Sequence, residues 1–167
     1  MNINELSRRI ISEFSTARPP KSNEIALEND WDADAINYDF SKFLLRPVDE
    51  SILENHDKSL AGFTPEAFAY FVKDYMLYTI NHIDEIESAE NELIEHMIFR
   101  FSNLDTNDKD WQEIIRILTP RQIGVILEFL KFLKKELLAM KNNVDPDYYL
   151  ECLDVAITAW GNQDKGQ

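Results

Sequence analysis

Three aspartates, Asp30, Asp32 and Asp34, alternate along the chain in the way that a calcium-binding loop begins. Such a loop needs glycine at its sixth position, for a sharp turn, and a bidentate glutamate at its twelfth. Ala35 and Ser41 occupy these two positions here. The pattern therefore does not predict calcium binding. It favours the start of a helix, where the positive end of the helix dipole stabilises carboxylates.

A second group with metal-ligating side chains is formed by Glu92 and His96. They are four residues apart, so they share a face if this segment is helical. The helical di-iron motif needs Glu and His three residues apart, and needs that pair twice. The sequence contains neither HExxH nor a pair of cysteines for zinc. We interpret Glu92 and His96 as an ordinary helix-surface pair, and we predict no metal and no cofactor.

The sequence offers little for nucleophilic catalysis. Cys152 is the single cysteine, and it lies between Tyr149 and Leu153 in a helical apolar pattern, where a packed thiol is the usual state. There is no GxSxG motif, and 4 glycines in the whole chain leave no glycine-rich phosphate loop. We therefore predict no catalytic residue. The alternative is an enzyme whose carboxylate or histidine site has no sequence signature.

Two aromatic residues stand in an acidic setting near the first third of the chain. Aromatic side chains are enriched at the anchors of protein interfaces. The candidate partner-binding residues here are Asp30, Trp31, Asp32, Asp34, Tyr38 and Asp39. The competing interpretation is that Trp31 simply docks its helix on the core.

A further acidic stretch lies between residues 74 and 99, where no Lys or Arg occurs. Glu85, Glu87 and Glu92 are additional candidates for contact with a cationic partner. Glu92 and Glu95 are three residues apart, and like charges at this spacing lower helix stability by a few tenths of a kcal/mol. A folded domain tolerates that cost, so a solvated face is the alternative interpretation.

The distribution of charge favours a basic protein partner. The chain has a net charge of −14, and residues 22–115 hold 22 Asp and Glu against 6 Lys and Arg, a net of −16. Such a surface repels DNA, RNA and anionic membranes. Its field favours encounter with a basic protein. The alternative is that the acidity only keeps the protein soluble.

Helical spacing of apolar residues dominates the chain, and three helix starts place a capping side chain directly before a proline. These are Thr64-Pro65, Thr119-Pro120 and Asp145-Pro146. The cap accepts hydrogen bonds from backbone N–H groups, while proline takes a position where its missing N–H costs nothing. Gln122 completes a capping box after Thr119. The predicted helices cover residues 3–14, 31–43, 49–55, 64–82, 86–101, 111–118, 119–141 and 145–160, with Asn2 as the first cap and Gly161 as the last stop.

The predicted fold is all-α, a single domain over residues 1–167 of about six to eight helices. The helix over residues 119–141 is apolar on most of its circumference, which predicts a central position. Residues 161–167 are predicted to be a disordered tail. Glu5 and Arg8-Arg9 stand where a secretory signal would need an apolar run, and no stretch is long enough to span a bilayer. The expected location is the cytoplasm.

Three segments resemble a family of small bacterial helical proteins of unknown function. They are Phe63-Thr64-Pro65-Glu66-Ala67-Phe68-Ala69-Tyr70-Phe71-Val72, Leu118-Thr119-Pro120-Arg121-Gln122 and Ala156-Ile157-Thr158-Ala159-Trp160. Lys73 stands where the family often has a proline. The shared motifs are caps and core positions, so the resemblance implies a helical fold and no catalytic residue.

These observations together predict a binding protein. The leading hypothesis is a bacterial cytoplasmic immunity protein that neutralises a cognate toxin, or another basic protein, by occlusion through its acidic surface. Small size, the acidic block and the absence of a catalytic constellation motivate it. The alternatives are the enzyme described above and a nucleic-acid mimic that blocks a DNA-binding protein. No nucleic acid and no membrane is predicted as a partner.

Overall fold

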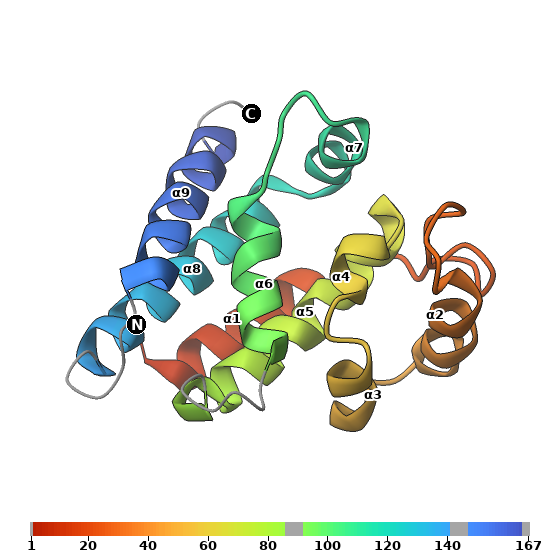
Figure 1. Ribbon diagram of the computed structural model, residues 1–167, viewed down its shortest axis with the longest axis horizontal. Helices are drawn as coiled ribbons and strands as arrows, with labels where there is room; N and C mark the ends of the chain where they lie inside the picture. The colour runs from red at the N-terminus through yellow and green to blue at the C-terminus, as the bar shows by residue number, and fades with distance from the viewer. Residues whose placement is uncertain (1, 86–91, 141–146, 165–167) are drawn as a thin grey trace.

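The computed structural model describes residues 2–85, 92–140 and 147–164 and arranges them as a bundle of helices (Figure 1). The α-helices are α1 (Ile3–Phe14), α2 (Ala33–Phe40), α3 (Glu50–Asn55), α4 (Ser59–Gly62), α5 (Pro65–Asn81), α6 (Glu92–Ser102), α7 (Lys109–Ile117), α8 (Pro120–Met140) and α9 (Asp147–Asp164). Two 3-10 helices, η1 (Ser41–Phe43) and η2 (Ile83–Glu85), follow α2 and α5.

The prediction of an all-α fold is confirmed for the described residues. They form nine α-helices where six to eight were predicted, because the short α4 has no sequence signal of its own. The β-pairing in these ranges is limited to one isolated antiparallel bridge, between Ala26 and Phe63. Within the same ranges, none of the helices combines the length and the apolar character that a bilayer crossing requires.

Side-chain caps mark the starts of α1, α5, α7 and α8, whereas α2, α3 and α4 begin without one. The side chain of Asn2 accepts a hydrogen bond from the Glu5 N–H at 2.9 Å. At the start of α8, Thr119 Oγ1 accepts from the Gln122 N–H at 3.2 Å, and Gln122 Oε1 accepts from the Thr119 N–H at 2.9 Å. This reciprocal pair is the predicted capping box. Asp145, the third predicted cap, lies outside the described residues.

Two helices share the centre of the bundle. As predicted, α8 is central: it packs against α1 and α9. The helix α5 packs against α1 and α7, and it is buried more completely, with 11 of its 17 residues shielded from solvent against 9 of 21 in α8. An aromatic cluster joins α6 and α7 to α9, because Phe101 and Trp111 both pack edge-on against Trp160.

The predicted helix stop at Gly161 is wrong. The helix α9 continues through Gly161 to Asp164. A glycine ends a helix by taking a positive φ, and no described glycine has one. Of the predicted disordered tail, residues 165–167 lie outside the described residues.

Candidate functional site

The helix α2 has two apolar faces, and the sequence alone did not reveal which one meets the core. Ile36 and Phe40 are buried, and Phe43 of η1 continues their face. Tyr38 of α2 is 70% exposed, and Trp31 is 92% exposed. Trp31 precedes the helix, which begins at Ala33 and not at residue 31 as predicted. The interpretation in which Trp31 docks its helix on the core is therefore wrong.

A third exposed apolar side chain extends the outer face. Leu45, directly after η1, is 95% exposed. We name the outer face the α2 stripe; it consists of Trp31, Ala35, Tyr38, Lys42 and Leu45. These residues follow one another at steps of four and three. Ala35 and Tyr38 lie within α2, whereas Trp31 precedes the helix and Leu45 follows η1. Sequence reasoning missed Leu45, although this spacing could have found it.

Contacts from the inner face fix the position of α2. The Phe40 ring packs edge-on against Phe63 and Phe71, with both ring centres 5.0 Å away. Asn37 Oδ1 accepts hydrogen bonds from the backbone N–H groups of Ile25 and Ala26, at 2.9 and 3.0 Å. These contacts fix α2, and with it Ala35 and Tyr38, against the rest of the fold. Figure 1 shows α2 at one end of the molecule, with α8 and α9 at the other.

The aspartates around the stripe have different roles. Asp30 Oδ1 accepts from the Asp32 N–H at 2.8 Å, and its carboxylate covers Gly62 so closely that a Cβ there would lie 2.0 Å from Oδ2. Asp30 therefore shapes the turn into α2. Asp32 is half-buried at the start of the helix, and Asp34 is exposed in its first turn.

Asp39 connects α2 to the neighbouring chain. Its carboxylate lies 2.9 Å from Lys42 Nζ and 3.0 Å from Nε2 of the buried His56. The hydrogen bond from Lys42, with that from His56, holds the pKa of Asp39 below its usual value. Lys42 also lies over the Tyr38 ring, 3.8 Å from its centre. The ring face at the middle of the stripe thus already receives an ammonium group, as a cation–π contact.

The second predicted group is not brought together as one surface. Glu85 belongs to η2 and lies 2.9 Å from His82 Nδ1. Glu92 begins α6, where Lys58 Nζ is 3.9 Å away. Glu87 lies outside the described residues. These glutamates stay candidates for partner contact. The exposed Tyr148 of α9 packs against Phe99, on the same helix as Glu92.

A group of possible metal ligands lies beside Glu92. Asp57, from the connection between α3 and α4, meets Glu92 and His96 of α6, and one ligand atom from each lies within 4.8 Å of the others. His96 Nδ1 is 2.8 Å from Asp57 Oδ2. Sequence reasoning found Glu92 and His96 but missed Asp57, because nothing local connects Asp57 with α6.

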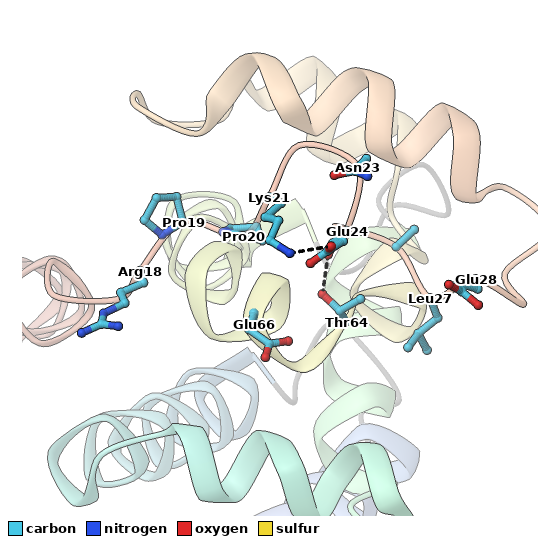
Figure 2. Close-up of a pocket in the computed structure, with 11 residues that line it drawn as sticks. Arg18, Pro19, Pro20, Lys21, Asn23, Glu24, Leu27, Glu28, Thr64 and Glu66 are labelled. Carbon is cyan, nitrogen blue, oxygen red and sulfur yellow. Dashed lines mark hydrogen bonds and ion pairs between the residues drawn. The ribbon is translucent and has the colours of Figure 1, made fainter.

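An open cavity of about 580 Å³ lies between the loop that follows α1 and the start of α5. Figure 2 shows Lys21 directed at Glu24, and Thr64 hydrogen-bonded to Glu24. Arg18 extends away from these groups. The residues that line the cavity, all within the described ranges, include neither histidine nor cysteine. The cavity offers polar contacts of both signs and no nucleophile–base pair.

Comparison with known proteins by sequence assigns the chain to a family. No curated protein and no solved structure matches it. The model of a family described as "Family of unknown function (DUF6714)" matches residues 3–147, which include α2, its outer stripe and the group around His96. The match agrees with the resemblance that the Thr-Pro helix starts carry. This chain belongs to DUF6714, a family of unknown function.

Proposed function

We propose that this protein is a binding protein whose α2 stripe docks onto a basic protein. The observation that carries the proposal is the exposure of Trp31, Tyr38 and Leu45 on and directly beside α2, a helix that is anchored to the core. Single exposed apolar residues are ordinary, but a contiguous group indicates an interaction surface. Large aromatic side chains supply much contact area at little entropic cost and dominate the binding energy of many interfaces.

Charge argues for the chemistry of the partner. Asp32 and Asp34 lie at the start of α2, and Glu28 is three residues before Trp31 in the chain, all within the acidic block of −16. A basic surface is attracted to them over a long range and is steered toward the stripe. A second copy of this chain would carry the same net charge of −14 and would be repelled. A basic protein is therefore the occupant to which the proposal commits.

The biological form that we propose is a bacterial cytoplasmic immunity protein. Toxins that act on nucleic acids or anionic surfaces need basic active-site surfaces, because they bind polyanions. A small acidic inhibitor with an aromatic anchor would cover such a surface and exclude the substrate. Trp31 would fill a pocket of the toxin, and the surrounding carboxylates would replace the substrate phosphates.

The test combines capture with matched variants. Tagged wild-type protein is used to capture partners from the native host, and the double variant Trp31→Ala/Tyr38→Ala is used in parallel. Tyr148→Ala is the control, since Tyr148 is 51% exposed on α9. The proposal expects a basic protein that the wild type and the control retain and the double variant loses.

Other outcomes would overturn the proposal. Equal retention by the double variant would place the interface elsewhere. An acidic or neutral partner would contradict the charge argument. A partner that DNA displaces from the wild type would favour the nucleic-acid mimic over the immunity protein. Self-association through the stripe, measured by light scattering, would replace the basic partner with a second copy.

A further inference from the structure

We propose that Asp57, Glu92 and His96 form a binding site for one divalent transition-metal ion of the Zn²⁺ type. The site would join the connection between α3 and α4 to the first turns of α6. It lies outside the α2 stripe and does not rest on the proposed binding function. Three observations carry it: the convergence of the ligand atoms, the state of His96 Nδ1 and the chemistry of the donor set.

The three ligand atoms converge from two separate parts of the chain. They lie within 4.8 Å of one another. Tetrahedral zinc with bonds of about 2.1 Å holds its ligand atoms about 3.4 Å apart, so small side-chain rotations bring the group onto one ion. Glu92 and His96 are one helical turn apart, which places both on the same face of α6. Asp57 approaches that face from the neighbouring connection.

The state of His96 Nδ1 supports the same site. This atom is shielded from solvent and lies 2.8 Å from Asp57 Oδ2, the distance of an ion pair. The imidazole and the carboxylate are therefore already held side by side. A metal ion would replace the proton in this pair and would be bound by both side chains.

The donor set selects the class of ion. One imidazole nitrogen and two carboxylate oxygens suit Zn²⁺ and related first-row ions, whereas Ca²⁺ and Mg²⁺ prefer oxygen ligands throughout. Three protein ligands leave a coordination position for water. Lys58 Nζ, 3.9 Å from Glu92 Oε2, is a weak competitor, because its side chain is 71% exposed. The ion would displace it from Glu92.

The experiment compares two histidines that both stand between carboxylates. Untagged wild-type protein is titrated with Zn²⁺ by calorimetry and with Co²⁺ by visible absorption, alongside His96→Gln and Glu92→Gln. His82→Gln is the matched control: Glu50 and Glu85 approach His82 on opposite ring nitrogens, so they cannot share one ion with a single nitrogen. Glu92 is exposed, so Glu92→Gln leaves the core intact.

The expected result is one equivalent of Zn²⁺ bound by the wild type and by His82→Gln. Each ligand variant should bind at least about tenfold more weakly, since even the outer partners of metal ligands are worth that much. Zn²⁺ should also raise the melting temperature of the wild type and not that of the ligand variants. Absence of binding to the wild type, or equal binding by His96→Gln, would overturn the proposal.

Discussion

At the residue scale, Trp31 should separate binding from folding. Its side chain is 92% exposed, so Trp31→Ala should change the free energy of unfolding by less than about 0.5 kcal/mol. The same substitution should raise the dissociation rate from the basic partner, because truncation of an anchoring aromatic costs about 2 kcal/mol or more of binding. Chemical denaturation and surface plasmon resonance measure the two effects.

Trp111 is a buried tryptophan and serves as the comparison for the exposed Trp31. It is 2% exposed, and its ring packs against Phe68 and Trp160. Trp111→Ala should cost about 3–5 kcal/mol of folding stability. If Trp31→Ala destabilised the fold to a similar degree, the stripe would belong to the core.

His82 should make stability depend on pH. Its Nδ1 lies 2.9 Å from Glu85, and its ring stacks on Tyr78. The hydrogen bond with Glu85, followed by that with Glu50, raises the pKa of His82 above its ordinary 6.5. The folded state thus holds this proton more tightly than the unfolded state.

The stabilisation from His82 is fully present below the unfolded pKa of about 6.5 and is lost as the pH rises through the raised folded pKa. The difference in melting temperature between wild type and His82→Gln should therefore be largest near pH 6 and shrink in alkaline solution. A difference that does not vary with pH would show that the carboxylates do not stabilise the charged ring.

At the element scale, the start of α8 should depend on its cap. Thr119→Ala removes the acceptor for the Gln122 N–H and should cost about 1 kcal/mol of folding stability. Thr158→Ala is the control, since its hydroxyl donates to the Asp154 carbonyl on an exposed part of α9 and caps no helix start. The two variants are compared by thermal denaturation. Equal melting temperatures would contradict this account of the cap.

Helix starts could be predicted because their causes are local. Thr64, Thr119 and Asn2 lie within three residues of the N–H groups that they cap. The inner face of α2 could not be assigned in the same way. Trp31 and Tyr38 recur at helical spacing just as Ile36 and Phe40 do, so apolar periodicity alone does not separate the two faces.

Contacts between segments that are far apart in the chain could not be predicted from the sequence. Asn37 bonds to the backbone of Ile25, and Asp57 meets His96, only because the loop after α1 and the helix α6 fold against them. No spacing rule connects such pairs. The candidate partner-binding residues around α2 could be proposed from composition, whereas the candidate metal ligands come together only in the folded chain.

At the scale of the whole molecule, the acidic field should control the rate of association. Glu28→Lys/Asp34→Lys reverses two exposed charges close to Trp31 in the chain and should slow association with the basic partner by up to about tenfold. The same reversal at Asp147 and Glu151, at the opposite end of the molecule, should have a smaller effect.

Added salt should reduce the difference in association rate between the two charge variants. Exposed charges are screened beyond about 8–10 Å at physiological ionic strength, so steering fades while short-range contacts persist. Stopped-flow measurements over a range of salt concentrations provide the test. Equal association rates for both variants at low salt would reduce the acidity to a role in solubility.

Site-specific photo-cross-linking in the native host tests the central claim most directly. A benzoylphenylalanine in place of Trp31 samples what the α2 stripe contacts, and one in place of Tyr148 samples the exposed surface of α9. The account predicts that a basic protein is cross-linked from position 31 and not from position 148. Cross-linking of that protein from position 148 alone, or the absence of any cross-linked protein at position 31, would contradict it.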